Sequence, residues 1–247
     1  MTPKPELKGK VALVTGGAKN IGRAIALALA DAGAHVAIVT RTAAKTAVVD
    51  ELRRRGVDAE HYLADVTDED AVKRVMVQID ERFGRLDLLV NNAALRNEVP
   101  FADLSLAQWR QVLAVTLDGA FLCAREGLPL LVASGAGTIV NIGGLTAYTG
   151  AKHRAHVVTA KAGLAGLTRA LAVELAPHAI TVNLVAPGLI DTVREGGTPQ
   201  HHQLHATLVG RRGTPEEVAS IVRYLAGPAA RFVTGQTIHL NGGAYLG

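Results

Sequence analysis

The sequence has a single cysteine, few aromatic residues and almost balanced charge. Because Cys123 has no second cysteine to pair with, a disulfide within the chain is excluded. Aromatic residues make up only 4% of the 247 residues, and the net charge is +4 from 26 basic and 22 acidic residues. So small an excess, spread along the chain, argues against a nucleic-acid-binding protein. The densest basic run, at 53–55, fits a solvated helix face.

Long apolar runs and a secretion signal are also missing. The apolar run at 24–30 is far too short to span a bilayer. Residues 1–10 contain no apolar stretch of the kind that a signal peptide needs. We therefore expect a cytoplasmic protein that does not bind membranes.

What the chain does have is 49% apolar residues and 26 glycines, which suits one large α/β domain. Strands are predicted at 10–17, 35–41, 59–66, 86–93, 137–143, 180–187 and 236–243. Helices are predicted at 21–33, 43–55, 68–84, 105–131, 153–176 and 214–227, with Ser105 and Thr214 at two of the starts. Continuous apolar strands separated by helices are typical of a parallel sheet that is covered on both faces. We therefore predict one doubly wound α/β domain over 1–247.

The segment 11–26, VALVTGGAKNIGRAIA, places a glycine-bearing turn between the first strand and the first helix. Glycine lets backbone N–H groups approach a phosphate, and a helix N-terminus favours its negative charge. The turn resembles the T-G-x-x-x-G-x-G motif of the short-chain dehydrogenase/reductase family. Thr15, Gly16 and Gly22 match the motif, and Asn20 replaces the middle glycine. Asparagine tolerates a left-handed backbone, so we expect the turn to survive this replacement.

The resemblance covers nearly the whole chain and includes members such as the 3-oxoacyl-acyl-carrier-protein reductases. Asp65–Val66 resembles the family's adenine-binding pair, 91–94 (NNAA) its NNAG, and 186–192 (APGLIDT) the segment that contacts the nicotinamide. The resemblance implies a Rossmann fold, a homotetramer and a small-molecule substrate. The cofactor-binding residues that it implies are Gly16, Lys19, Asn20, Ile21, Gly22, Arg41, Thr42, Asp65, Val66, Asn92, Ala93, Ala94, Lys161, Pro187, Gly188, Ile190 and Thr192.

The cofactor is predicted to be NADP rather than NAD. NAD-binding sites usually carry an acidic residue near the end of the second strand, where it bonds the ribose 2′-hydroxyl. Here that position is Thr40, and no acidic residue lies between 32 and 49. Arg41, with Lys19 in the first turn, can instead face a 2′-phosphate, which a planar guanidinium suits well.

At the catalytic positions the resemblance breaks down. The family carries a proton-donating Tyr four residues before a Lys on the long helix, a Ser thirteen residues before that Tyr, and an Asn on the preceding helix. Lys161 matches the lysine, but the other three positions hold Val157, Gly144 and Thr116. We therefore expect an NADP-dependent oxidoreductase with an atypical site and low activity on ordinary ketones. Its substrate would be a small carbonyl, alcohol or imine-like compound.

A Tyr–x–x–x–Lys pattern does occur elsewhere in the chain, as YTGAK at 148–152. It is predicted to lie in the loop ahead of the long helix, where its spacing is a chance match. That loop borders the substrate cleft in the family, so Tyr148 could still reach a substrate. His156, directly before the vacated tyrosine position, is the first candidate for a replacement proton donor, and Tyr148 is the second. Arg154 adds a cation nearby. Alternatively, these side chains serve subunit contacts or the surface.

A non-catalytic hypothesis also stands, namely an NADP(H)-binding sensor or assembly protein on the same fold. Measured turnover would separate it from an enzyme. His201 and His205 have a spacing that can hold a metal on a helix, but no carboxylate flanks them, so we expect no metal site. Segment 189–211 is where substrate preference could be encoded.

Overall fold

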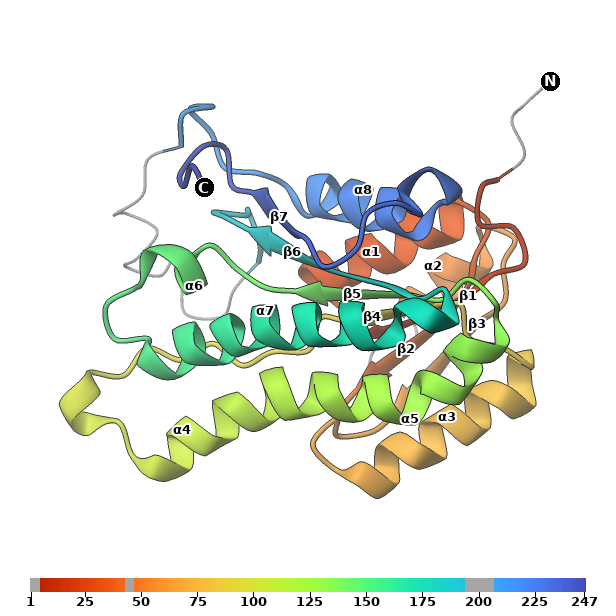
Figure 1. The fold of residues 1–247 in the computed structure, drawn as a ribbon, viewed down its shortest axis with the longest axis horizontal. Helices are drawn as coiled ribbons and strands as arrows, with labels where there is room; N and C mark the ends of the chain where they lie inside the picture. Colours follow the sequence, from red (N-terminus) through yellow and green to blue (C-terminus); the bar gives the residue numbers. More distant parts are fainter. Residues whose placement is uncertain (1–4, 43–46, 194–206) are drawn as a thin grey trace.

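A parallel sheet forms the centre of the molecule (Figure 1). The computed structural model describes residues 5–42, 47–193 and 207–247. Within these residues, seven strands follow the order β3-β2-β1-β4-β5-β6-β7. Their bounds are β1 Val11–Thr15, β2 His35–Thr40, β3 Ala59–Leu63, β4 Leu88–Asn91, β5 Thr138–Ile142, β6 Thr181–Pro187 and β7 Thr237–Leu240. All neighbouring strands run parallel, as the alternation of strands and helices in the sequence predicts.

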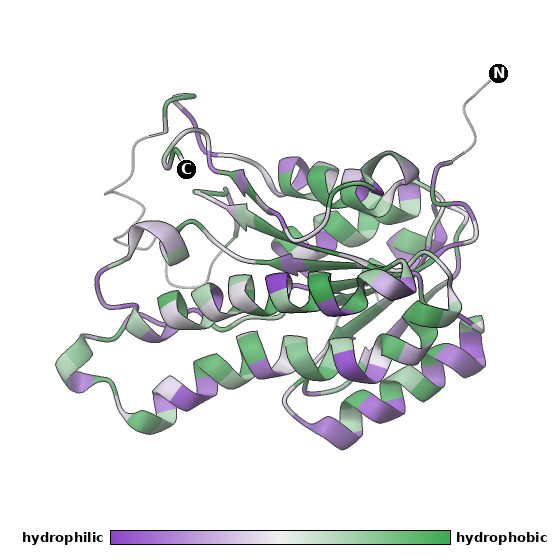
Figure 2. Cartoon of the chain, viewed as in Figure 1, coloured by the Kyte–Doolittle hydropathy of each residue, from purple (hydrophilic) through white to green (hydrophobic). Residues whose placement is uncertain are grey.

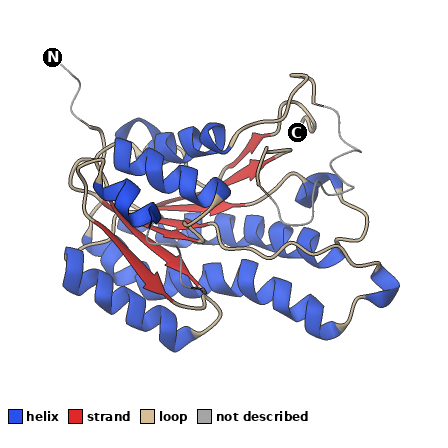
Figure 3. Ribbon diagram, turned by 180° about the vertical axis from the view of Figure 1, so that it is seen from behind, coloured by secondary structure: helices blue, strands red, loops and turns tan. Residues whose placement is uncertain are grey.

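Helices cover both faces of this sheet (Figure 3). One face carries α1 Asn20–Asp31, α2 Ala47–Arg53 and α8 Pro215–Ala226, and the other carries α3 Glu69–Phe83, α5 Gly119–Ala133 and α7 Ala155–Leu175. Side chains along β1 point alternately to the two faces of the sheet. Ala12 and Val14 pack with the first group of helices, and Val11 and Leu13 pack with the second. Figure 2 shows hydrophobic residues along the strands and hydrophilic residues on outer helices such as α3. The predicted doubly wound Rossmann fold is therefore confirmed.

Two predicted helix starts are confirmed by their side-chain caps. Ser105 precedes α4 Leu106–Leu113, and its hydroxyl accepts from the Gln108 N–H at 3.2 Å. Thr214 precedes α8 in the same way, with Glu217 completing a capping box and Pro215 at the first helical position. Such caps satisfy N–H groups that a helix cannot pair internally.

Several elements differ from the sequence prediction. The helix predicted at 105–131 is interrupted after α4 by a π-helical segment, Ala114–Asp118, before α5 begins. Such bulges are frequently found at functional sites. The long helix begins at Ala155 rather than at 153, because the backbone of His153 is left-handed, with φ 62°. Of the helix predicted at 43–55, residues 43–46 lie outside the described part of the chain.

The segment with Tyr148 forms a short helical turn instead of the predicted loop. This turn, α6, spans Thr146–Thr149 and ends at Gly150, whose φ of 72° favours glycine. Among the described helices, none has the length and apolar character that crossing a membrane requires.

A buried carboxylate fixes the start of β4. Asp87 accepts hydrogen bonds from Lys10 Nζ and from the Val11 N–H, each at 2.9 Å. Arg85 donates two more through Nε and Nη2, each at 2.7 Å. Burial raises the pKa of the Asp87 carboxyl, but the four donors outweigh burial and hold the pKa below its usual range. This network joins the beginning of β1 to the beginning of β4.

We expect Asp87→Asn to lower the free energy of unfolding at neutral pH by about 1–3 kcal/mol, because its charge-assisted hydrogen bonds are lost. A carboxyl whose folded-state pKa is lowered stabilises the fold above its unfolded pKa of about 3.9. This contribution is lost as the pH falls through the folded-state pKa. Urea unfolding at pH 7 and at about pH 3 should therefore show a smaller acid-induced loss in Asp87→Asn than in wild type. The exposed Asp103→Asn is the control, and equal behaviour of the two variants would count against this role.

Candidate active site and cofactor groove

The turn between β1 and α1 uses backbone conformations that few side chains allow. Gly16 has φ 65° and Asn20 has φ 49°, which confirms the left-handed backbone predicted at Asn20. A Cβ on Gly22 would overlap the carbonyl oxygen of Gly16 and lie 2.6 Å from Asn92 Nδ2. Any larger residue at 22 would therefore displace the turn, whose open backbone fits a phosphate group.

Thr15 links the carboxyl ends of β1 and β4. Its hydroxyl accepts hydrogen bonds from the N–H groups of Asn92, at 2.9 Å, and Ala93, at 3.0 Å. Asn92 donates a further hydrogen bond of 2.9 Å from Nδ2 to the carbonyl oxygen of Thr15. The strand order reverses between β1 and β4, and open α/β sheets bind ligands at such a point. The sequence shows Thr15 only as a motif match, and its linking role is visible only in the structure.

A groove over these strand ends brings together many of the predicted cofactor residues. It is lined by Gly16, Ala18, Lys19, Val39, Thr40, Arg41, Thr42, Ala64, Asp65, Val66, Ala93, Ala94, Leu95 and Val115. Asp65 is held in place by Thr67, whose N–H and hydroxyl donate to Oδ1 at 2.9 and 2.8 Å. The groove therefore joins the first turn, the end of β2 and the segments that follow β3 and β4.

The end of β2 favours a phosphate over a bare ribose hydroxyl. Thr40 Oγ1 donates to the Thr42 carbonyl oxygen at 2.6 Å and lies 2.7 Å from Nε2 of His61. Burial lowers the pKa of His61, so this imidazole is neutral near pH 7. Lys19 and Arg41 are exposed at the groove. The groove thus offers two cations where an NAD site offers a carboxylate, and it fits the 2′-phosphate of NADP.

Four other predicted cofactor residues line neither this groove nor the pocket beside Lys161. Gly22 and Asn92 form the close contact described above. The Asn20 side chain exchanges two hydrogen bonds of 3.1 Å with the backbone of Val193, and so ties α1 to the segment after β6. Thr192 lies in that segment, next to Val193.

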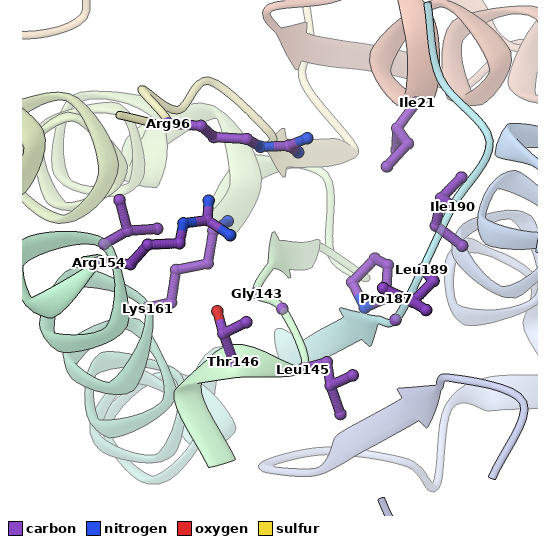
Figure 4. A pocket seen from close by; sticks show the side chains of 13 residues that line it. Ile21, Arg96, Gly143, Leu145, Thr146, Arg154, Lys161, Pro187, Leu189 and Ile190 are labelled. Atoms are coloured by element: carbon purple, nitrogen blue, oxygen red, sulfur yellow. The ribbon is translucent and has the colours of Figure 1, made fainter. Parts of the chain in front are cut away.

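A second pocket lies at the carboxyl ends of β5 and β6, beside α7 (Figure 4). It is lined by Ile21, Arg96, Gly143, Gly144, Leu145, Thr146, Arg154, Val157, Lys161, Pro187, Gly188, Leu189 and Ile190. The predicted cofactor residues among these are Ile21, Lys161, Pro187, Gly188 and Ile190. Figure 4 shows the basic side chains on one wall and the side chains of Ile21, Leu189 and Ile190 on the other.

Lys161 is a buried amine at the wall of this pocket. Its side chain comes from α7, and Nζ donates a hydrogen bond of 2.8 Å to the Ile142 carbonyl oxygen at the end of β5. Burial, followed by the charges of Arg96 and Arg154, lowers the pKa of Lys161 to about 7. The amine can therefore gain or lose a proton near neutral pH.

Two of the three positions that differ from the family pattern lie at this pocket. Val157 and Gly144 both line the pocket, and a Cβ on Gly144 would lie 3.3 Å from Cδ of Lys161. Thr116 is buried inside the π-helical segment. Thr146, which sequence reasoning missed, contributes a hydroxyl to the same pocket. The pocket therefore keeps the lysine but has neither a tyrosine nor a serine at the family's positions.

Neither predicted proton donor lies among the residues that line the pocket. Tyr148 Oη lies 3.1 Å from Thr237 Oγ1, and its ring packs against His239 and Tyr245, with centroids 4.5 and 5.6 Å apart. His156 is fully buried, and its ring nitrogens have no hydrogen-bond partner in the described part of the chain. Burial, and then Arg154, lowers the pKa of His156, so its imidazole is neutral near pH 7 and carries no imidazolium proton to donate. The structure therefore brings neither residue to the lining of the pocket, because α6 and α7 direct them elsewhere, and their assignment as donors stays a prediction.

Arg96 is a pocket residue that the sequence analysis did not identify. It follows the NNAA segment after β4, but no motif marks it. The described residues contain no group of three or more His, Cys, Asp or Glu side chains that could hold a metal. His201 and His205 lie outside the described residues.

The chain is similar over nearly its whole length to known reductases and dehydrogenases. The profile of the family described as Enoyl-(Acyl carrier protein) reductase matches residues 16–245. A 3-oxoacyl-[acyl-carrier-protein] reductase of Aquifex aeolicus is 39% identical, with 97% of this chain and 99% of the relative covered. A cis-4-hydroxycyclohexanecarboxylate dehydrogenase of Sinomonas cyclohexanicum is 40% identical, with 95% and 96% covered. A crystal structure of a short chain dehydrogenase from Burkholderia cenocepacia in complex with NADP superposes with a TM-score of 0.91 at 34% identity, covering 97% and 99%.

We expect NADP(H) to bind at least about tenfold more tightly than NAD(H), which corresponds to about 1.4 kcal/mol. Arg41→Ala should remove most of this difference, because it removes a guanidinium that is expected to face the 2′-phosphate. Fluorescence titration of both reduced cofactors measures it. Arg74→Ala, an exposed change on α3, is the matched control. Identical titration curves for NADPH and NADH in wild type would refute the assignment of the 2′-phosphate site.

Proposed function

The chain belongs to the short-chain dehydrogenase/reductase family and is an oxidoreductase that uses NADP; we propose that its reaction takes place in the pocket beside Lys161, with this amine handling the proton in place of the missing tyrosine. The observation that carries the proposal is the buried Lys161 Nζ with a pKa near neutrality, in a pocket that Val157 and Gly144 leave without their family side chains.

In this proposal the groove binds the adenosine end of the cofactor, and the pocket binds its nicotinamide end. Bound NADP supplies or takes up a hydride. Lys19 and Arg41 would hold its 2′-phosphate, and Asp65 with Val66 would line its adenine site. The segment Pro187–Ile190 would border its nicotinamide end, where it forms the apolar wall of the pocket.

Lys161 can move a proton in either direction of the reaction. In reduction, the ammonium form donates a proton to the oxygen of the substrate carbonyl. In oxidation, the neutral amine accepts the proton of the alcohol. The hydrogen bond to the Ile142 carbonyl oxygen fixes the position of Nζ in both forms. Thr146 provides a hydroxyl in the same pocket that can hold the substrate oxygen in the absence of a serine.

The identity of the substrate does not follow from similarity. The names of the two curated relatives refer to an acyl group on a carrier protein in one case and to a free hydroxy acid in the other. An imine-like substrate would relieve the need for a proton donor, because an iminium already carries its charge. The homotetramer and the cytoplasmic location that the sequence analysis predicts remain predictions.

The alternative is a non-catalytic NADP(H) sensor or assembly protein, and the substitutions at 144 and 157 favour it over an enzyme of the ordinary type. Turnover of any carbonyl or alcohol substrate separates the two hypotheses. Cofactor binding does not, because both require it.

The pH dependence of reduction tests the role of Lys161. Because the ammonium form is required, kcat/KM should fall as the pH rises through about 7, and kcat/KM for oxidation should rise over the same range. In Lys161→Gln, and in Lys161→Arg whose guanidinium does not release its proton, this limb of the pH profile near pH 7 should disappear. The rate should also fall by about 10²–10⁴-fold. NADPH affinity, measured separately, shows how much of the loss is weaker cofactor binding. His156→Gln and Tyr148→Phe should leave the limb in place, and its loss in either one would transfer the role to that residue.

Restoring the family side chains should raise activity on ordinary ketones. Val157 precedes Lys161 by one helical turn, so Val157→Tyr with Gly144→Ser places both hydroxyls beside the amine. We expect slow reduction of simple β-keto esters by wild type and at least about a tenfold increase in the double variant. Val157→Phe with Gly144→Ala is the matched control for added volume, and thermal unfolding monitors the core contacts of Val157. Turnover typical of an intact enzyme in wild type would contradict the atypical site.

A further inference from the structure

A threonine hydroxyl at the end of β2 holds the backbone beside Arg41. Thr40 Oγ1 and the Thr42 carbonyl oxygen lie 2.6 Å apart. Two oxygen atoms this close share a proton, and because a carbonyl group has none, the hydroxyl of Thr40 donates. Within the described residues, this is the only hydrogen bond made by the backbone of Thr42. The position of the chain on both sides of Arg41 therefore depends on the direction of one hydroxyl.

His61 sets that direction from the neighbouring strand β3. Its Nε2 lies 2.7 Å from the same Oγ1 of Thr40. Because the single proton of the hydroxyl is directed at Thr42, the hydroxyl accepts from His61, and the proton of this second contact belongs to Nε2. A chain of two hydrogen bonds thus runs from the imidazole through the Thr40 hydroxyl to the Thr42 carbonyl oxygen.

The pairing of β2 with β3 places the imidazole at this hydroxyl. In the parallel register the partner of His61 is Ile38, and the partner of Thr40 is Leu63. Ile38 and Thr40 lie two residues apart on one strand and so share a face of the sheet, along which His61 reaches diagonally. The imidazole is half-buried, and burial lowers its pKa, so near pH 7 it is neutral and carries its one N–H proton on Nε2.

The strand itself does not need this contact. The Gly16 N–H donates to the Val39 carbonyl oxygen at 2.7 Å, and the Ala64 N–H donates to the Thr40 carbonyl oxygen at 3.0 Å. These backbone bonds fix the end of β2 whatever side chain stands at position 61. Thr42 lies beyond them, so the hydrogen bonds from His61 act on the segment that follows the strand.

We propose that His61 is a positioning residue for cofactor selection, which holds the segment that carries Arg41 in the arrangement that binds the 2′-phosphate of NADP. Arginine has many rotamers, and a backbone that is fixed beforehand lowers the entropic cost of ordering its side chain on a ligand. NADH has no 2′-phosphate and gains nothing from this arrangement. The inference rests on the assignment of Arg41 to the 2′-phosphate and is independent of the proton transfer proposed for Lys161.

Fluorescence titration with NADPH and NADH separates positioning from a general structural role. His61→Phe keeps a ring but removes the N–H donor, and it should weaken NADPH binding by about three- to tenfold. NADH affinity should stay close to that of wild type. His61→Gln supplies an amide N–H donor and should restore most of the NADPH affinity. His35→Phe is the matched control, because it removes a hydrogen-bonded imidazole at the other end of β2, and it should leave both affinities unchanged.

Thr40→Val tests the second member of the chain and keeps the experiment decisive if His61→Phe does not fold. Loss of the hydroxyl should weaken NADPH binding by a similar factor. The double variant should bind NADPH no more weakly than either single variant, because both changes break the same chain of hydrogen bonds. Losses that add in the double variant, or an equal weakening of NADPH and NADH, would overturn the proposal.

Arg41→Ala separates this inference from the assignment on which it rests. In that background His61→Phe should cause no further loss of NADPH affinity, and a further loss would overturn the positioning role. If Arg41→Ala narrows the difference between NADPH and NADH but His61→Phe and Thr40→Val do not, Arg41 keeps its role and the role of His61 is overturned. If Arg41→Ala leaves the difference unchanged, both are overturned, while the reaction proposed at Lys161 still stands on its own pH profile.

Discussion

The junction between the carboxyl ends of β1 and β4 is the constraint on which the site depends. Asn92 donates two hydrogen bonds to Thr15 across it, and the missing side chain of Gly22 lets the first turn of α1 lie against it. The groove opens on one side of this junction. If the junction shifted, the phosphate-binding turn and the segment that carries Arg96 would shift with it, because both begin within a few residues of these contacts.

The chemistry proposed for the pocket rests on one substitution and its surroundings. In the family pattern a lysine acts beside a tyrosine, but here Val157 leaves Lys161 facing the pocket without that neighbour. Burial and two nearby guanidinium groups bring its pKa to about 7, where an amine exchanges protons readily.

Tyr148 and His156 are close to Lys161 in the sequence, but local structure directs both side chains away from the pocket. Gly150 and the left-handed backbone of His153 turn the chain between α6 and α7. As a result, Tyr148 packs against the side chains of His239 and Tyr245, while His156 is directed into the protein interior. Spacing along a helix identifies residues that share a face only where the helix is continuous, and here it begins at Ala155.

The sequence by itself determined the parallel sheet, the glycine turn, the choice of NADP and the vacated positions at 144 and 157. These features depend on local patterns, such as apolar runs, the Thr15–Gly22 motif and the missing acid after β2, and local patterns are written in consecutive residues. Only the tertiary structure decided that Arg96, Arg154, Thr146 and Lys161 line one pocket. Arg96 lies before β5 in the chain and the other three lie after it, so no local pattern in the sequence brings Arg96 to the residues at the start of α7. The pKa of Lys161 is set by that convergence, because desolvation and charge act through space rather than along the chain.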